Sequence, residues 1–386
     1  MNITKIIDSI YITTLLLGWA GLFVSYAVAQ APPASTPPAG TPPADVAPIA
    51  VKAVGYEWPH VGGQILAVSF STDGKMALSV NSDGLVKFWD VASGQMVRTI
   101  NRDMKIVAAA FLENKKVGLA RSWDGGNATH IMNITTGSEK ETLLGHRGGV
   151  TALVFSPDGE WILSGGRNKA LTLWGVEYGE PIREFFGHKE EIKSVIFSPN
   201  KEMIGSSSAD KTIKIWSTRT GKNLLTFKPH KKEVLAVAFS PDGQSILSGG
   251  LDKVKPAPVF SVKLWDMSKK PWWRFSKKPI ATLGEDQTEI AVAAFSPDGK
   301  FILSGDRKGK IKMWEIATGK EMRTFEENKG EVRTAAFSFD GKLLVTGGEG
   351  KLNLWDTTGE NKVGGLSPPK GTAPKGAKPA KKGKKG

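Results

Sequence analysis

The chain has 386 residues, no cysteine, 44 glycines, 22 prolines and a formal net charge of +14. Hydrophobic residues make up 40% of the sequence, which is enough for a real core and excludes wholesale disorder. The absence of cysteine excludes a disulfide framework, a cysteine nucleophile and every cysteine-ligated zinc or iron–sulfur site.

The first 29 residues have the composition of an export leader. A mostly apolar run extends from Ile10 to Ala29 and is densest between Leu15 and Val24. The dense part has the length of a signal-peptide core, and the final AVA resembles a cleavage site. The whole run of about 20 residues is also long enough to anchor the chain in a bilayer. We therefore expect residues 1–29 to be a signal peptide or an N-terminal membrane anchor. Both alternatives predict export to the periplasm or cell envelope, with the remainder either anchored or secreted.

Residues 30–48 form a proline-rich linker. Their repeated Pro-Pro pairs favour polyproline II, a semi-rigid conformation that rises about 3.1 Å per residue. We expect this segment to hold the next domain away from a membrane or a terminus.

Residues 49–366 contain seven copies of one pattern, marked by phenylalanines that are mostly 41–44 residues apart, with one gap of 56. Each copy holds four short runs of β-branched and aromatic residues bounded by Gly, Asp and Pro, the pattern of four short strands. Four such strands make no stable domain alone, whereas seven sheets arranged radially bury each other's faces. We predict an all-β fold, a seven-bladed β-propeller of four-stranded antiparallel blades. The seven phenylalanines are Phe70, Phe111, Phe155, Phe197, Phe239, Phe295 and Phe337.

The copies resemble WD repeats (WD-40), because several hold Gly-His near the start and Trp-Asp at the end of the third strand. The resemblance implies a structural tetrad of His, Ser or Thr, Asp and Trp in each copy. Carried over residue by residue, it gives four sets: His60, Ser79, Asp83 and Trp89; His146, Ser164, Asn168 and Trp174; His188, Ser206, Asp210 and Trp216; His230, Ser248, Asp252 and Trp265.

Three copies depart from the family pattern. The second has Met132-Asn133 in place of Trp-Asp. The sixth and seventh lack the histidine and carry Lys308 and Glu349 at the position of the tetrad aspartate. We expect these two blades to lack the same buried hydrogen-bond network and to be less rigid.

The strand that closes the ring has two candidates. The segment from Ile49 to Trp58 resembles the fourth strand of a preceding copy, and its pairing with the last blade would latch the ring shut. The segment from Lys362 to Leu366 competes for the same place.

The histidines and the repeated aspartates favour structural roles over catalytic or metal-binding ones. His146, His188 and His230 are 42 residues apart, so they lie on separate blades, too far apart to hold one ion. The aspartates of the FSPDG turns recur once per copy and are expected to cap the local backbone. No nucleophile elbow, phosphate-binding glycine loop or HExxH pattern occurs in the sequence. We expect no enzyme activity, cofactor, metal or small-molecule substrate.

The fifth copy carries two insertions, residues 253–260 and residues 267–279, which lie on either side of its third strand. The second reads MSKKPWWRFSKKP and combines aromatic with basic side chains, a composition common in binding hot spots. The same composition suits an anionic membrane or a nucleic acid, and a third alternative is a hairpin that covers the neighbouring blade. The candidate partner-binding residues are Trp272, Trp273, Arg274, Phe275, Lys277 and Lys278.

The last segment, residues 367–386, has seven lysines and no acidic residue. It holds nothing that could bury a core, so we expect a disordered tail. A flexible polycation binds anionic surfaces in a salt-dependent way, and the alternative is a solubilising tail without a specific partner.

The WD-repeat resemblance implies a non-catalytic platform that binds other proteins. The first hypothesis is therefore an interaction scaffold of the cell envelope that binds partner proteins through the propeller faces and the loops of the fifth blade. The SPDG turns resemble those of bacterial WD-repeat proteins, which favours the periplasm. The second hypothesis is a binder of an anionic polymer or membrane surface, through the lysine tail and the WWRF loop. A propeller enzyme is the third, and it needs convergent polar groups at the channel mouth.

Overall fold

The computed structural model describes residues 49–51, 57–59, 63–71, 73–101, 106–112, 116–121, 128–133, 139–144, 146, 148–253, 259–268, 275–284, 287–326, 331–349 and 351–358. The leader, the linker and the lysine tail lie outside these residues. Within the described part of the chain, no helix has the length and apolar character needed to cross a membrane.

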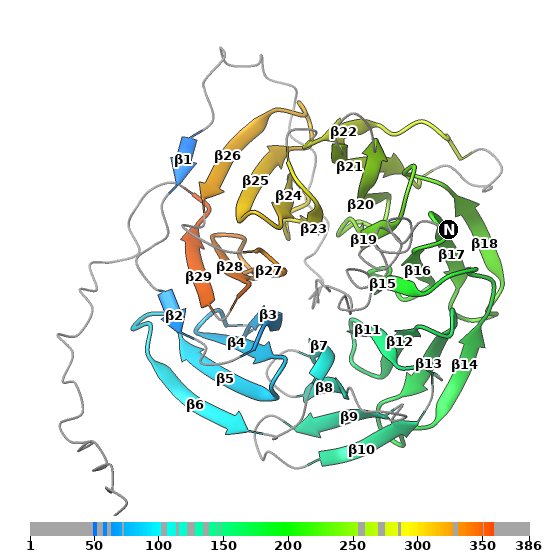
Figure 1. Cartoon of the computed structure of the whole chain (residues 1–386), viewed down its shortest axis with the longest axis horizontal. Coiled ribbons are helices and arrows are strands. Elements are labelled where there is room, and N and C mark those ends of the chain that lie inside the picture. The colour runs from blue at the N-terminus through cyan, green and yellow to red at the C-terminus, as the bar shows by residue number, and fades with distance from the viewer. Residues whose placement is uncertain are drawn as a thin grey trace, which may run out of the picture.

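The described strands form seven sheets around a common centre, the arrangement of an all-β propeller (Figure 1). We number the sheets one to seven in chain order. Sheet one holds β3 (Ile65–Phe70), β4 (Met76–Asn81), β5 (Leu85–Asp90) and β6 (Met96–Asn101). Sheet two holds β7 (Ile106–Leu112), β8 (Lys116–Arg121), β9 (Ala128–Asn133) and β10 (Glu139–Leu144). Sheet three holds β11 (Val150–Phe155), β12 (Trp161–Gly166), β13 (Leu171–Gly175) and β14 (Pro181–Phe185).

The remaining sheets continue the same order around the ring. Sheet four holds β15 (Ile192–Phe197), β16 (Met203–Ser208), β17 (Ile213–Ser217) and β18 (Asn223–Phe227). Sheet five holds β19 (Val234–Phe239), β20 (Ser245–Lys253), β21 (Val259–Asp266) and β22 (Ala281–Leu283). Sheet six holds β23 (Ile290–Phe295), β24 (Phe301–Asp306), β25 (Lys310–Glu315) and β26 (Glu321–Glu326), and sheet seven holds β27 (Thr334–Phe337), β28 (Leu343–Gly347) and β29 (Lys351–Asp356).

Two N-terminal strands join sheets six and seven. The strand β2 (Glu57–Pro59) pairs antiparallel with β29, so the segment predicted from Ile49 to Trp58 supplies the closing strand. The strand β1 (Ile49–Val51) pairs in parallel with β26 and gives sheet six a fifth strand. The prediction of seven four-stranded antiparallel blades is therefore right for six sheets and wrong for sheet six. The competing segment, residues 362–366, lies outside the described residues.

The position of a strand in its sheet explains its composition. The first strand of each sheet lies nearest the centre, and the last lies at the rim (Figure 1). Inner strands such as β3 and β11 are buried at every residue, because neighbouring sheets cover both of their faces. The rim strand β6 is mostly exposed, which explains why the last run of each copy is the least hydrophobic.

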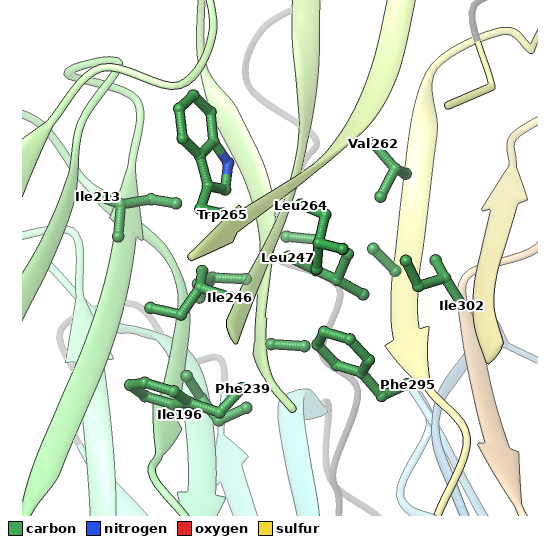
Figure 2. Close-up of a cluster of buried hydrophobic side chains, with 14 of the residues drawn as sticks. Ile196, Ile213, Phe239, Ile246, Leu247, Val262, Leu264, Trp265, Phe295 and Ile302 are labelled. Carbon is green, nitrogen blue, oxygen red and sulfur yellow. The ribbon is translucent and has the colours of Figure 1, made fainter. Parts of the chain in front are cut away.

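The core lies between neighbouring sheets. Figure 2 shows one cluster, in which side chains from sheets four, five and six meet. Ile196 of β15 lies beside Phe239 of β19, and Phe295 of β23 belongs to the same cluster. Each sheet thus buries its apolar faces only by stacking on the next one, as expected for a repeat fold.

The recurring Ser-Pro-Asp-Gly turn has one hydrogen-bond pattern. In sheet three the Ser156 hydroxyl donates to Asp158 (2.6 Å) and accepts from the backbone amide of Trp161 (2.9 Å). Asp242, Asp298 and Asp340 accept the same serine hydrogen bond in later sheets. The predicted backbone-capping role of these aspartates is confirmed.

Candidate interaction faces

The tetrad of sheet four is complete and buried. The His188 Nδ1 atom lies 2.8 Å from the Asp210 carboxylate, and its Nε2 atom lies 2.8 Å from the Ser206 hydroxyl. The Trp216 indole donates to the same hydroxyl at 2.9 Å. The four side chains thus connect the loop before β15 to β16 and β17. Thr212 adds a fifth member, because its hydroxyl donates to Asp210 at 2.6 Å.

Sheet three makes the same network with an amide in place of the carboxylate. His146 lies 2.9 Å from the Asn168 side-chain oxygen and 2.7 Å from Ser164. Trp174 donates to Ser164 at 2.7 Å, so the substitution of Asn168 for aspartate preserves the geometry.

The tetrad of sheet one is described only in part. The Trp89 indole donates to Ser79 at 3.0 Å, as predicted. Asp83 is exposed, and His60 lies outside the described residues.

The tetrad of sheet five departs from the prediction at Asp252. His230 and Trp265 both contact Ser248, at 2.9 and 3.0 Å, but Asp252 lies 3.3 Å from His230 Nδ1 without a hydrogen bond. The carboxylate instead accepts from Lys263 (2.6 Å) and from Ser261. The reason is the insertion, which lengthens β20 and β21 and shifts their register between Leu251 and Lys253. Asp252 therefore lies within a strand rather than in a tight turn.

Sheet six contains a substitute network that the sequence prediction missed. The buried Gln287 takes the place of histidine and accepts a hydrogen bond from Ser304 (2.6 Å). Trp314 donates to Ser304 at 2.9 Å. Asp306, two residues before Lys308, accepts from the backbone amides of Thr288, Lys308 and Lys310. This sheet lacks the histidine network of sheet four, as expected, but it holds a different buried network, because glutamine offers both a donor and an acceptor. In sheet seven, Trp355 donates to Thr346 at 2.9 Å.

The tetrad histidines of sheets three, four and five are neutral at pH 7. Burial lowers the pKa of His146, His188 and His230, and hydrogen bonds to their partners oppose this effect only in part. Burial acts to raise the pKa of Asp210, but hydrogen bonds from His188, Thr212 and the backbone of Lys189 outweigh it and hold that pKa well below its usual range. In sheets three and four, a neutral imidazole that donates to an amide or carboxylate oxygen and accepts from serine satisfies every partner.

The lowered histidine pKa values predict a loss of stability in mild acid. In the unfolded chain each histidine titrates near pH 6.5, so below that pH the unfolded state binds more protons than the folded state. The stabilisation is complete above about pH 7 and falls as the pH drops through 6.5. We expect the free energy of unfolding to fall between pH 7 and pH 5, by about 1.4 kcal/mol per pH unit for each histidine at most. Urea denaturation at closely spaced pH values measures this slope.

A control for this prediction is provided by Glu289. Burial raises the pKa of its carboxyl, Arg307 lowers it in part, and Glu331 and Glu233 raise it further. A raised carboxyl pKa contributes stability that increases as the pH falls, which opposes the histidines. The Glu289→Gln variant removes this term, so its slope should be steeper than that of the native chain. If the free energy of unfolding of that variant does not change between pH 7 and pH 5, the assignment of neutral tetrad histidines is contradicted.

Ion pairs join sheet four to sheet five and sheet six to sheet seven at one end of the inner strands. Lys193 lies 2.5 Å from Glu191 and 3.4 Å from Glu233. Arg307 lies 3.1 Å from Glu289 and 3.0 Å from Glu331, and Arg333 lies 2.5 Å from Glu331. Glu331 and Arg333 are nearly buried, so their mutual pairing offsets the cost of desolvation. These pairs join adjacent sheets and leave this face mixed in charge.

The second insertion of sheet five is described from Phe275 onward. Phe275 packs on Phe227 (ring centroids 4.7 Å apart) and on Trp265 (6.3 Å), so its ring anchors the loop to the sheet. Phe275 is only partly buried, so its assignment as a partner-binding residue stays a prediction beside this packing role. Lys277 and Lys278 are exposed, and Ile280 is 59% exposed. Trp272, Trp273 and Arg274 lie outside the described residues.

Among the described residues, no group of three or more His, Cys, Asp or Glu side chains has the arrangement of a metal site. The tetrad histidines lie on different sheets, each bound to its own serine.

Two family models match the sequence. The model described as the first β-propeller of IFT122 matches residues 150–367, which is more than half of the chain. The model described as WD domain, G-beta repeat matches residues 56–90.

Similar proteins come from distant organisms and align over short regions. Protein tipD of Dictyostelium discoideum is 28% identical over 123 residues, 32% of this chain and 20% of tipD. An uncharacterized WD repeat-containing protein of Synechocystis, sll1491, is 28% identical over 113 residues, 29% of this chain and 32% of its own length. Target of rapamycin complex subunit LST8 of Saccharomyces cerevisiae is 25% identical over 99 residues, 26% of this chain and 33% of LST8. The chain thus spans about a third or less of each of these relatives.

Proposed function

We propose, because the chain belongs to the WD-repeat β-propeller family, that it is a non-catalytic scaffold that binds partner proteins. WD-repeat propellers generally act as platforms for other proteins, and one relative bears the name of a complex subunit. The observation that carries the proposal is that the polar side chains of the repeats make hydrogen bonds within their own sheets. The tetrad histidines and the turn aspartates are bound to their own sheets, where they stabilise the fold.

The proposed location is the cell envelope. The support is the apolar run of residues 10–29 followed by the proline-rich residues 30–48, the order of a leader or anchor and a spacer. N-terminal sequencing and fractionation of the protein from its own host test this part. A chain that begins at Gln30 in a soluble envelope fraction, or at Met1 in the membrane fraction, supports it. An intact chain in the cytoplasm contradicts it.

The proposed contact region on the scaffold is the rim of sheet five. Phe275 fixes the base of the inserted loop on the core, while Lys277, Lys278 and Ile280 face solvent. A loop that is anchored by one side chain loses less conformational entropy on binding a partner than a free loop does. The interfaces of non-obligate complexes have an apolar core and a polar rim, so the exposed Ile280 fits the core of such an interface and the two lysines fit its rim.

Site-specific photo-cross-linking in the native host tests this region. A benzophenone side chain at position 278 should form adducts with one or a few discrete proteins. The matched control is position 222, because the exposed Lys222 lies on the turn between β17 and β18, the equivalent loop of sheet four. The same adducts at both positions, or none at 278, contradict the assignment of the sheet-five rim.

A second candidate function is the binding of an anionic polymer or membrane surface. The observation that favours it is the exposure of Lys277 and Lys278, added to seven lysines in the last 20 residues. Retention on heparin and on phosphatidylglycerol vesicles should then fall steeply between 50 and 200 mM salt, by about 10³-fold if six phosphates are contacted. The double variant K277E/K278E should weaken it further. Salt-independent cross-links at position 278 favour the protein scaffold instead.

A further inference from the structure

A groove runs between sheets three and four on the outer side of the ring. Its volume is about 630 Å³, and its apolar lining comes from four strands. Leu173 and Ile182 belong to sheet three, and Met203 and Leu224 belong to sheet four. Ile182 is 45% exposed, so the apolar lining reaches the surface of the molecule. The apolar lining is therefore accessible to a ligand from solvent.

Two buried polar atoms line this groove without a hydrogen-bond partner among the described residues. One is Nε of Arg183, which lies on the rim strand β14. The other is the hydroxyl of Thr218, a residue only 5% exposed. Buried donors without partners are costly, and native structures contain few of them. Arg219 also lines the groove and is exposed, whereas Lys201 is already paired with Asp158 and Glu160.

The equivalent groove between sheets six and seven shows how the same positions are satisfied within the chain. That groove is smaller, about 310 Å³. Arg323, the counterpart of Arg183, donates through Nη2 to the carbonyl of Thr358, although its Nη1 has no partner. Thr357, the counterpart of Thr218, donates to the carbonyl of Gly341 (2.5 Å).

A carboxylate also distinguishes the two grooves. Asp356 follows the tetrad tryptophan of sheet seven and attracts Arg323 electrostatically. The residue at that position in sheet four is Ser217, which is neutral and lines the larger groove. At this position sheet four therefore offers Arg183 no carboxylate, whereas sheet seven offers one to Arg323. Among the described lining residues Glu202 is the only carboxylate, and it accepts a hydrogen bond from Asn200 (3.0 Å).

We propose that the groove between sheets three and four binds an extended segment of a partner protein that presents an acidic side chain flanked by apolar ones. The carboxylate pairs with Arg183, with Arg219 nearby, and supplies the charge that Asp356 supplies to Arg323. The apolar neighbours cover Leu173, Ile182, Met203 and Leu224. Charge excludes the lysine tail of this chain as the occupant, because seven cations would meet two arginines. This inference rests on the proposed scaffold function and names the chemistry of one partner class.

Selection from a phage-displayed random octapeptide library on the full-length chain tests the groove. The expected enriched sequences hold Asp or Glu between aliphatic or aromatic residues. Synthetic peptides of the enriched sequence, with Asp or with Asn at the acidic position, are then compared by fluorescence anisotropy. The Asn peptide should bind at least about 10-fold more weakly, because the partly buried Arg183 loses its charged partner.

Three variants locate the site. Arg183→Leu should weaken the binding of the acidic peptide by at least about 10-fold. Ser217→Asp introduces into sheet four the residue that sheet seven has at this position. The new carboxylate should compete with the peptide for Arg183 and weaken peptide binding by a similar factor. Arg98→Leu is the matched control, because Arg98 occupies the same strand position in sheet one, beside Phe88, and should leave binding unchanged. Thermal unfolding verifies that each variant folds.

Each other outcome overturns the assignment. Failure to enrich any sequence, enrichment of sequences without a carboxylate, or equal affinity for the native, R183L and S217D chains all exclude an acidic-segment site here. The cross-links expected at position 278 do not depend on the groove. If these cross-links form and no acidic peptide is selected, the groove assignment alone is overturned. If an acidic peptide is selected and the cross-links are absent, the sheet-five rim alone is overturned. The absence of both results overturns the scaffold function.

Discussion

Replacement of Trp216 by alanine is expected to lower the free energy of unfolding by about 3–5 kcal/mol. The side chain is 2% exposed and contacts Phe185 and His188 edge to face, with ring centroids 5.8 and 6.1 Å apart. Its indole also donates to Ser206 at 2.9 Å. The variant therefore leaves a large cavity between sheets three and four and removes one donor of the tetrad. Urea denaturation followed by circular dichroism measures the loss.

Two further variants separate packing from hydrogen bonding. Trp216→Phe keeps most of the buried area but loses the indole donor, so we expect a loss of about 1–3 kcal/mol. Ser206→Ala removes the acceptor of the same bond. If the tetrad acts as a network, the double variant should be destabilised by less than the sum of the two single variants. Strict additivity, or a Trp216→Ala loss below 1 kcal/mol, is incompatible with the tetrad as a stabilising element of sheet four.

Removal of residues 1–62 is expected to lower Tm by about 10 °C or more, or to abolish cooperative unfolding. The strand β2 is the outer neighbour of β29, and its removal leaves the hydrogen-bonding groups along one edge of sheet seven without a partner strand. It also separates the N-terminal end of the ring from the C-terminal sheet. Differential scanning calorimetry measures both the midpoint and the cooperativity.

Two shorter truncations serve as controls. A chain that begins at Ile49 retains β1 and β2 and should match the native Tm. A chain that begins at Tyr56 loses only β1, which adds a fifth strand to an already complete sheet, so its Tm should fall less. A peptide of residues 52–62 added in trans should partly restore the chain that begins at Gly63. Equal Tm values for the chains that begin at Ile49 and at Gly63 rule out β2 as the closing strand.

The propeller was predictable because each copy repeats its chemistry at a fixed interval. Each periodic Phe, Trp or FSPDG turn predicts the position of one strand or turn. A copy that departs from the pattern can therefore be assigned from its neighbours. The tetrads of sheets three and four followed from residue matching, and their hydrogen bonds are present. His60 and most of the WWRF loop lie outside the described residues, so their roles stay predictions.

Substitution of one residue type by another with similar hydrogen-bond capacity limited the prediction of sheet six. Gln287 lies 17 residues before its serine, nearly the 18 that separate histidine from serine elsewhere. The spacing was therefore a usable signal, but a search for histidine alone passes over it. The prediction for Asp252 was wrong for a different reason. Its spacing matched the family pattern, but the insertion after it changed the local backbone from turn to strand.

Features formed between sheets leave no pattern in one copy. The groove between sheets three and four takes its lining from residues spread between Trp161 and Leu224. The distinction between Arg183 and Arg323 depends on the residue that follows the tetrad tryptophan of the next sheet, Ser217 or Asp356. Likewise, Glu331 pairs with Arg307 and Arg333, and nothing in the sequence of one copy indicates that these charges meet.

The pairing of β2 with β29 fixes the order in which the molecule can assemble. Pro59 pairs with Lys351, about 290 residues later in the chain. At a ribosomal rate of about 5–20 residues per second, β2 therefore waits about 15–60 s for its partner strand to be synthesised. During that time its hydrogen-bonding edge is available to the completed β29 of another copy. Two chains that exchange their N-terminal strands satisfy every ladder, so strand-exchanged dimers are the misassembly expected at high expression.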